Sequence, residues 1–297
     1  MVLNLDMDKI LIEQWGVEYL GGVESSIQNT MSYAENKAFF LKAIANPNIM
    51  ALLTKKVIYQ ELQSYIQREI MIFITENPRF YFWKIHNQYG GIFKKYICDI
   101  KNYRGNNVKI HPTAYVEDNV YLGDNVEVGV HAYIASNSYV GDNSYVGNGV
   151  VVGAQGLELA YNGYEKVMIQ RYGGVKIGNS VDIMDNSVVS KSVWGVTELQ
   201  DSVSIAVLCN IAANCIIGKA TRMSGNCLIG GSAKLGENVI LGPSVTIKDG
   251  ISIGSNSRIR IGSVVVQSFP ENSDVSGNFA FDHIKNIRLF ARNKNGQ

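Results

Sequence analysis

Residues 116–152 read VEDNVY LGDNVE VGVHAY IASNSY VGDNSY VGNGVV V, in which an aliphatic side chain returns at every sixth position. The same spacing extends over 23 positions in three blocks, and all 23 carry an aliphatic residue or Met, although only 46% of the chain is hydrophobic. The spacing is therefore an internal repeat. The blocks are Ile110 to Val152, Ile177 to Val189 and Leu199 to Val265.

Two further positions of the hexad are restricted in type. A small or β-branched residue follows each aliphatic residue by four places, as at Ala132 and Ser138. The residue before it is usually Asn or Gly, as at Asn119 and Gly149, and these types tolerate a positive φ. Each hexad is therefore expected to hold a short strand and a corner.

A six-residue period excludes helices, whose period is 3.6, and simple alternating strands. A parallel β-helix accounts for it, because three hexads close an 18-residue triangular coil and successive coils stack their aliphatic columns. The period does not fix the handedness. Residues 154–174 and the four residues Gly195–Glu198 interrupt the register, and loops that leave a rigid scaffold are common binding sites.

The flanking segments lack the hexad, which predicts three parts: residues 1–105, the β-helix over 106–270 with its excursion at 154–174, and an extension over 271–297. The first part reads as an α/β domain. Its elements are a helix over Lys56–Glu69 with Ile58, Leu62 and Tyr65 on one face, a strand over Ile70–Ile74, and a helix that starts at Asn77-Pro78 and ends at Gly90-Gly91. The extension is expected to form a helix over Phe281–Arg292.

Composition excludes several classes of protein. The 27 basic and 26 acidic residues leave a net charge of +1, which does not suit a dedicated nucleic-acid binder. No run approaches the ~20 apolar residues of a membrane span, and the N-terminus has no signal-peptide pattern, so we expect a cytoplasmic protein. Four Cys without a C-x-x-C pair and four scattered His predict no metal site.

The whole arrangement resembles the UDP-3-O-(3-hydroxyacyl)glucosamine N-acyltransferases of lipid A biosynthesis. The matching points, in chain order, are Asn46-Pro47, Asn77-Pro78-Arg79, Gly153-Ala154-Gln155-Gly156, Gln170 and Val275-Ser276-Gly277. The resemblance implies a left-handed parallel β-helix with an N-terminal nucleotide-sugar-binding α/β domain and a C-terminal helix. It also implies a homotrimer with active sites between subunits. Such enzymes move an acyl group from a thioester of acyl carrier protein or coenzyme A to a sugar amine, without another cofactor.

The residues that match the family's catalytic segment lack its acid–base groups. The segment Ile205–Asn214 has Ala213 at the position of the family's histidine base and Ala206 at the position of the carboxylate that orients it. Gly250 stands where the family has a second histidine. A sugar ammonium must lose a proton before it attacks a thioester, so another proton acceptor is required for catalysis.

Several other residues are candidates for site roles. Asn210, Asn214 and His131 are weak catalytic candidates, although Asn214 and His131 also fit a purely structural role at a corner. The resemblance implies substrate contacts at Asn46, Gly156 and Gln170. The basic residues Lys285, Arg288 and Arg292 of the expected terminal helix are either a surface for an acidic carrier protein or the solvated face of a packed helix. Cys209, Cys215 and Cys227 occupy the small-residue column and are expected to be buried.

Two functions remain open at this stage. The first is an N-acyltransferase for a nucleotide-linked amino sugar in lipid A or surface glycan biosynthesis, with an atypical active site. The second is an inactive relative that binds a nucleotide sugar or acyl carrier protein, or assembles with an active paralogue. The sequence fixes neither the acyl length, the sugar acceptor nor the donor carrier.

Overall fold

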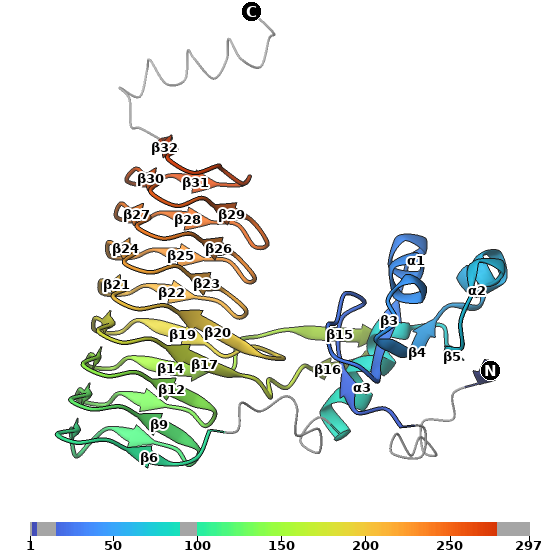
Figure 1. Cartoon of the computed structure of the whole chain (residues 1–297), viewed down its shortest axis with the longest axis horizontal. Helices are drawn as coiled ribbons and strands as arrows, with labels where there is room; N and C mark the ends of the chain where they lie inside the picture. The colour runs from blue at the N-terminus through green and yellow to red at the C-terminus, as the bar shows by residue number, and fades with distance from the viewer. Residues whose placement is uncertain (1, 5–15, 90–99, 278–297) are drawn as a thin grey trace, which may run out of the picture.

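The computed structural model describes residues 2–4, 16–89 and 100–277. Within these ranges the chain forms an α/β domain and a column of stacked coils, which stand beside each other (Figure 1). Three parallel sheets make the three faces of the column, and every coil contributes one strand to each sheet. The predicted fold, a left-handed parallel β-helix with an N-terminal α/β domain, is confirmed. The predicted helix over Phe281–Arg292 lies outside the described residues.

The three faces are called sheets one, two and three here, in the order of strands β7, β8 and β9. Sheet one contains β7 (Lys109–Ile110), β10 (Glu127–Val128), β13 (Tyr145–Val146), β18 (Asp182–Ile183), β21 (Ser204–Ile205), β24 (Arg222–Met223), β27 (Ile240–Leu241), β30 (Arg258–Ile259) and β32 (Asp274–Val275). Sheet two contains β8 (Tyr115–Val116), β11 (Tyr133–Ile134), β14 (Val151–Ala154), β19 (Val188–Ser190), β22 (Asn210–Ile211), β25 (Leu228–Ile229), β28 (Thr246–Ile247) and β31 (Val264–Val265). Sheet three contains β6 (Tyr103–Arg104), β9 (Val120–Leu122), β12 (Ser138–Val140), β17 (Gly174–Ile177), β20 (Val196–Leu199), β23 (Ile216–Ile217), β26 (Lys234–Leu235) and β29 (Ser252–Ile253).

The strand register confirms the predicted 18-residue coil. Glu127 pairs with Lys109 on one side and with Tyr145 on the other, a separation of 18 residues each time. The aliphatic positions of the hexads point inward and form a single core, in which Ile177 and Ile217 have no exposed surface. Burying a side chain of this size contributes roughly 1.5–3 kcal/mol, so the stacked columns are the main source of stability.

Left-handed backbone conformations close the corners between the sheets. Asn119, Asn125 and Asn143 have φ between 57° and 59°, as the corner pattern predicts. His131 (φ 54°) and Leu208 (φ 60°) adopt the same conformation, although leucine is an uncommon choice for it. The corners therefore impose one backbone conformation even where the side chain does not favour it.

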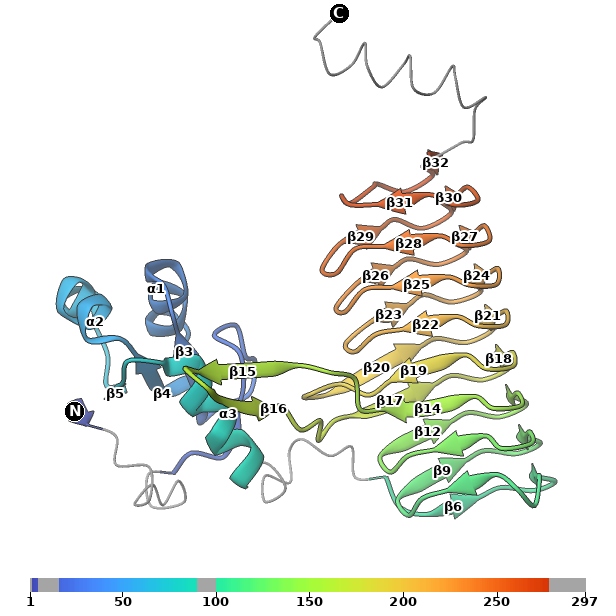
Figure 2. The same cartoon turned by 180° about the vertical axis from the view of Figure 1, so that it is seen from behind.

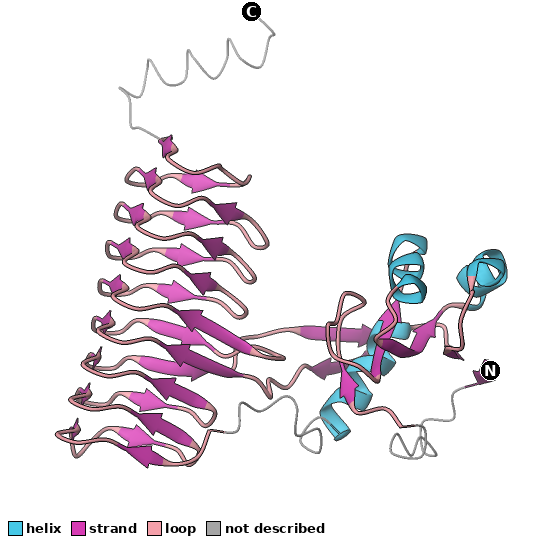
Figure 3. Cartoon of the chain, in the orientation of Figure 1, coloured by secondary structure: helices cyan, strands magenta, loops and turns pink. Residues whose placement is uncertain are grey.

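The N-terminal domain is a five-stranded parallel sheet with helices on both faces. The strand order is β1 (Val2–Asn4), β5 (Met71–Ile74), β4 (Ile49–Thr54), β3 (Thr30–Ala34) and β2 (Tyr19–Leu20). Helices α1 (Lys37–Ala45) and α2 (Lys56–Leu62) pack on one face, and α3 (Pro78–Tyr89) packs on the other. All helices of the described chain belong to this domain (Figure 3), and none of them is long and apolar enough to cross a membrane.

The predicted helices and strand of this domain are confirmed with one difference. Strand β5 matches the predicted strand, and the Asn77 side chain caps α3 by accepting a hydrogen bond from the Phe80 N–H (3.1 Å). The helix expected over Lys56–Glu69 is shorter. It ends at Leu62 and continues as one 3₁₀ turn over Gln63–Tyr65, so that Tyr65 is exposed rather than on the buried face.

The excursion at residues 154–174 connects the two parts of the molecule. It forms an antiparallel hairpin of β15 (Leu159–Asn162) and β16 (Glu165–Met168), which extends from the coils to α3 (Figure 2). Asn77 Nδ2 donates to the Tyr161 carbonyl and Asn87 Nδ2 to the Met168 carbonyl, both at 2.7 Å. The hairpin therefore packs as an added layer on the α3 face of the N-terminal domain.

The second interruption lies earlier than the sequence pattern indicated. Gly195 is the last residue of a loop over 191–195, and the residues expected in the insertion, up to Glu198, instead form β20, which pairs with β17. The four extra residues therefore lie within the 191–195 loop. Buried and partly exposed residues already alternate within β20, before the next aliphatic position of the hexad. The sequence pattern therefore placed the interruption too late in the chain.

Candidate functional site

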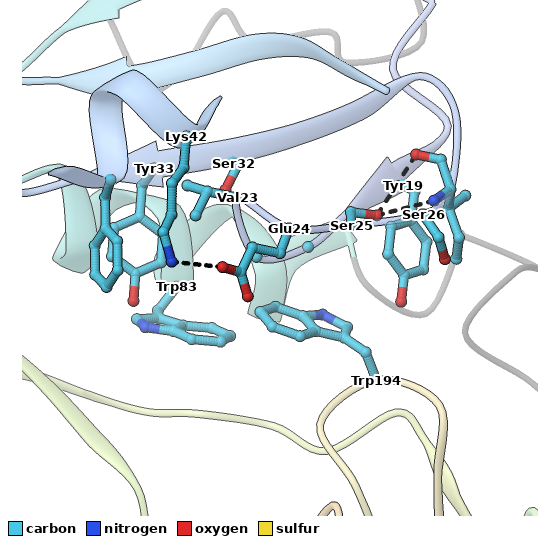
Figure 4. Close-up of a pocket in the computed structure, with 14 residues that line it drawn as sticks. Tyr19, Val23, Glu24, Ser25, Ser26, Ser32, Tyr33, Lys42, Trp83 and Trp194 are labelled. Carbon is cyan, nitrogen blue, oxygen red and sulfur yellow. Dashed lines mark hydrogen bonds and ion pairs between the residues drawn. The ribbon is translucent and has the colours of Figure 1, made fainter. Parts of the chain in front are cut away.

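A cavity of ≈550 Å³ lies where the N-terminal domain meets the 191–195 loop of the β-helix (Figure 4). Its walls come from the segment after β2, from β3, from α1 and from α3, and Trp194 closes it from the opposite side. Neither domain forms this cavity alone. We call it the interdomain pocket.

Aromatic rings form one side of the interdomain pocket. Trp83 of α3 and Trp194 stack in near-parallel planes, with ring centroids 5.1 Å apart and 15° between the planes. Tyr33 packs against Phe82 behind them, with ring centroids 4.9 Å apart. Flat aromatic surfaces of this kind suit a planar or apolar ligand.

Polar groups line the other side of the pocket. Lys42 and Glu24 form an ion pair of 2.5 Å at the exposed rim, and the hydrogen bond from Lys42 lowers the pKa of Glu24. Ser25 is fixed within its loop, since its hydroxyl accepts a hydrogen bond from the Ile27 N–H (3.1 Å) and lies 3.1 Å from the Thr30 hydroxyl.

Ser32 differs from these residues, because its hydroxyl lines the pocket, is fully buried and makes no hydrogen bond within the described chain. A buried hydroxyl without a partner costs roughly 1–3 kcal/mol, so a hydrogen bond from a bound molecule to Ser32 would be favourable. Trp83 Nε1, on the aromatic side of the pocket, is likewise buried without a hydrogen bond.

Asn46, expected to contact substrate, has a structural position beside this pocket. Its amide nitrogen donates to the carbonyls of Val23 (3.0 Å) and Ser25 (2.9 Å), and its oxygen accepts from the Asn48 N–H (3.0 Å). Asn46 thus shapes the loop that lines the pocket. Direct contact of Asn46 with substrate stays a prediction.

His86 connects the pocket to the hairpin. The Trp194 Nε1–H donates to His86 Nδ1 (3.4 Å), so Nε2 carries the proton and donates to the carbonyl of Gln170 (2.8 Å). Burial lowers the pKa of His86 to about 4, and the Gln170 carbonyl opposes part of that shift. The neutral ring therefore holds Trp194 in place from behind the pocket.

The two expected loop residues contribute backbone rather than side-chain contacts. Gln170 accepts from His86 through its carbonyl and donates its N–H to Asn87 Oδ1 (2.9 Å). Gly156 has a φ of 49° and lies under the Arg171 guanidinium, where a Cβ would be 3.0–3.2 Å from its atoms. Both residues position the excursion, and their roles toward substrate stay predictions.

Ala206 and Ala213 lie at different corners of one coil. Ala206 follows β21 at the corner between sheets one and two, whereas Ala213 precedes β23 at the corner between sheets two and three. Strand β22 separates them, and at ~3.3 Å per extended residue the intervening chain spans up to about 20 Å. Within one chain the two positions therefore lie at the two ends of strand β22.

Lys191 lies at the same corner of the β-helix as Ala213, one coil earlier in the stack. Val189 pairs with Ile211, and Lys191 and Ala213 each follow this pair by two residues. Lys191 is 7% exposed, and burial lowers the pKa of its amine while the Glu117 carboxylate partly opposes the shift. An amine with a lowered pKa is a suitable proton acceptor.

The remaining candidates have the structural positions that their pattern favoured. Asn214 and His131 are corner residues with φ of 61° and 54°, and Asn210 is exposed on sheet two. Cys209, Cys215 and Cys227 are buried in the core, as predicted. Lys285, Arg288 and Arg292 lie outside the described residues. Within residues 16–89 and 100–277, no group of three acidic, His or Cys side chains is arranged to hold a metal ion.

The sequence pattern gave little indication of Trp83, Trp194 and Ser32. The four extra residues between the second and third blocks were the available signal for Trp194, because a tryptophan in an insertion has no place in the coil core. Ser32 lies in a strand and becomes notable only through its missing hydrogen bond.

The bacterial transferase hexapeptide family (six repeats) matches residues 105–135 and 122–154 of the chain. Over 76 residues the chain is 37% identical to the UDP-3-O-acylglucosamine N-acyltransferase of Acidovorax sp. (strain JS42) and 38% identical to that of Shewanella denitrificans. These segments cover 26% of the chain and 23% and 22% of the two relatives. The matches span about a quarter of the length of these curated relatives. The resemblance predicted from the sequence is confirmed in this part of the chain.

Two solved structures are also similar to the chain. LpxA from Acinetobacter baumannii is 22% identical, with a TM-score of 0.45 over 65% of this chain and 78% of that one. The Arabidopsis UDP-N-acetylglucosamine acyltransferase is 22% identical, with a TM-score of 0.45 over 63% of this chain and 66% of that one.

The His86 contact predicts a pH-dependent stability. The native state keeps His86 neutral down to a pKa of about 4, whereas the unfolded chain protonates it near 6.5. Its contribution is therefore complete above pH 6.5 and is lost as the pH falls toward 4, by about 2 kcal/mol between pH 7 and pH 5. Denaturant unfolding followed by tryptophan fluorescence should show this loss in the wild type and a smaller one in His86→Phe. The variant His131→Asn, which suits the positive φ of its corner, should keep the wild-type dependence; equal slopes in all three proteins would contradict the assignment.

Proposed function

We propose that this chain is an N-acyltransferase that moves an acyl group from a thioester to the amine of a nucleotide-linked sugar, in lipid A or surface glycan biosynthesis. The donor is a thioester of acyl carrier protein or coenzyme A, and no other cofactor takes part. The partial similarity to UDP-3-O-acylglucosamine N-acyltransferases supports the reaction class. The observation that carries the proposal is the interdomain pocket with its unpartnered Ser32 hydroxyl.

The interdomain pocket suits the nucleoside end of such a substrate. A volume of ≈550 Å³ is within the usual range for small-molecule sites. The half-buried ring of Trp194, which stacks on the buried Trp83, offers an aromatic surface to a base, and Ser32 offers one buried hydrogen bond. At the rim, the Lys42 ammonium can turn from Glu24 to a phosphate, because an exposed ion pair is worth only about 0–1 kcal/mol.

Because position 213 is not a histidine, acyl transfer catalysed by this chain needs another proton acceptor. The sugar ammonium gives up a proton, its nitrogen forms a bond to the thioester carbonyl carbon, and the C–S bond breaks to release a thiol. Lys191 supports this step, since its backbone lies at the same corner as Ala213 and burial lowers the pKa of its amine. We propose Lys191 as the acceptor, in its deprotonated form.

A second function is favoured by a specific observation, the absence of ionisable side chains at Ala206 and Ala213. In this alternative the chain binds a nucleotide sugar or acyl carrier protein without catalysis, or assembles with an active paralogue. The two functions share the interdomain pocket and differ in the acyl-transfer step. A binding test and a transfer test therefore separate them.

Ser32→Ala tests nucleotide binding. Removing the hydroxyl should weaken binding of UDP and UDP-N-acetylglucosamine by roughly three- to tenfold, as expected for loss of one neutral hydrogen bond. The unfolding free energy should stay the same or rise, because a buried group without a partner is removed. Isothermal titration calorimetry and denaturant unfolding measure the two quantities.

Ser25→Ala is the matched control for this test. Its hydroxyl also borders the pocket but is bonded within its loop, so its loss should lower stability more than affinity. Unchanged nucleotide affinity in Ser32→Ala, or no binding by the wild type, would exclude the pocket as the nucleotide site.

Lys191→Met tests the acyl-transfer step. With 3-O-acylated UDP-glucosamine and an acyl thioester, this variant should lose about 10²- to 10⁴-fold in kcat, the usual contribution of a general base. Ala213→His in the same background should restore part of the rate and move its pH dependence toward that of an imidazole. Lys176→Met, which removes an exposed lysine paired with Glu198, should keep the wild-type rate. A wild-type chain that binds the nucleotide sugar but transfers no acyl group identifies the second function instead.

We also propose that the chain assembles as a homotrimer through sheet two and its corner with sheet one. Apolar side chains are exposed there, including Leu208 (59%), Leu228 (46%) and Val264 (56%). Leu208 holds a positive φ as well, and an exposed leucine in that conformation has no evident benefit to an isolated chain. Contacts between copies would also bring the corners of Ala206 and Ala213 from different chains within reach of each other.

Sedimentation of the purified chain tests the assembly. The wild type should sediment with three times the mass of one chain, and Leu208→Asp, which tolerates the positive φ but adds a charge, should shift the protein toward the monomer. Leu157→Asp places the same charge on the exposed excursion and should leave the mass unchanged. A monomeric wild type would contradict the proposal.

A further inference from the structure

A second concave region lies on sheet one and is independent of the interdomain pocket. Its volume is ≈620 Å³, and side chains of β18, β21, β24, β27 and β30 line it. In both views these strands form the edge of the β-helix that is farthest from helices α1 to α3 (Figures 1 and 2). We call this region the sheet-one groove.

Two arginines project from alternate strands of the groove. Arg222 pairs in register with Ile240, and Ile240 pairs with Arg258, so both arginines lie in one outward column with an apolar residue between them. The strand spacing of ~4.8 Å places the two backbone positions about 10 Å apart. Guanidinium groups on side chains of this length can converge on one ligand above Ile240.

Neither arginine is hydrogen-bonded or ion-paired within the described chain, although the charge of Arg258 helps to lower the pKa of Asp274. Arg222 and Arg258 are exposed, and neither guanidinium lies within 4 Å of a carboxylate there. Arg260, at the nearby corner, is different, because its guanidinium donates two hydrogen bonds to Asp274 at 2.8 and 2.6 Å. Asp274 is thus already engaged, although its register places it beside Arg258.

The groove also carries one carboxylate, Asp182, which lies two strands from Arg222 on the side away from Arg258. Ser204 and Ser224 contribute hydroxyl groups, and Gly225 leaves the backbone uncovered. Ile240 and Met184 add an apolar surface. The groove therefore combines two exposed guanidinium groups without hydrogen bonds, hydroxyl donors and a small apolar floor.

We propose that the sheet-one groove is a binding site for an organic phosphate, whose phosphate groups are held by Arg222 and Arg258. The planar guanidinium donates paired hydrogen bonds that match phosphate oxygens, and two of them suit a diphosphate or a pair of neighbouring phosphates. Ile240 does not compete for either guanidinium. The site does not require the chain to be an acyltransferase, but it lies beside Ala206 and would hold a phosphate-bearing substrate or donor at that corner.

Inorganic pyrophosphate is the first probe, since it carries the shared chemistry without a base or an acyl chain. Calorimetric titration of the full chain should give saturable binding, and Arg222→Gln or Arg258→Gln should each raise the Kd at least tenfold. The affinity should fall steeply with added salt. Arg260→Gln removes an arginine that is already paired and should leave the Kd within about twofold of the wild type. No binding, or binding unaffected by the first two variants, would overturn the proposal.

Competition then identifies the source of the phosphate. Displacement of pyrophosphate by coenzyme A alone assigns the groove to a donor, and displacement by UDP alone assigns it to a nucleotide sugar. Failure of both to compete overturns the assignment to an organic phosphate. Using the Ser32→Ala protein for the UDP titration separates this site from the interdomain pocket. Because the readout is binding to Arg222 and Arg258, the result does not depend on acyl transfer.

Discussion

Closure of the 18-residue coil is the constraint on which the rest of the structure depends. Each coil buries its aliphatic positions only if three strands of similar length meet at three corners, and most corners contain a residue with a positive φ. The backbone of successive coils then pairs at a fixed register of 18 residues. Because every strand is held on both sides, outward side chains are displayed in straight columns on a rigid surface.

Both proposed sites use departures from this regular scaffold. The interdomain pocket exists because two insertions leave the coil: the hairpin of β15 and β16 attaches to α3, and the 191–195 loop brings Trp194 against Trp83. The neutral His86 ring joins the two insertions by bonding Trp194 on one side and Gln170 on the other. The sheet-one groove, in contrast, uses the regular column itself, in which alternate strands carry Arg222 and Arg258.

The positions of Ala206 and Ala213 change how the missing base is understood. The resemblance treats them as one catalytic pair, and the coil places them at the two ends of strand β22. In the proposed acyl transfer, the proton acceptor that replaces histidine at position 213 comes from the neighbouring coil, where Lys191 is buried, or from another chain. Leu208, two residues after Ala206, is exposed and belongs to the surface proposed for assembly.

The sequence by itself determined the coil, because the aliphatic and Asn positions recur at a fixed local spacing that is visible in the repeat. It also determined the burial of Cys209 and the corner role of Asn214, because both follow from position within the hexad. The tertiary structure alone decided the pocket at Ser32, the contact of Trp83 with Trp194 and the pairing of Arg260 rather than Arg258 with Asp274. These features join residues far apart in the chain or depend on whether a polar atom finds a partner, and neither property leaves a periodic trace in the sequence.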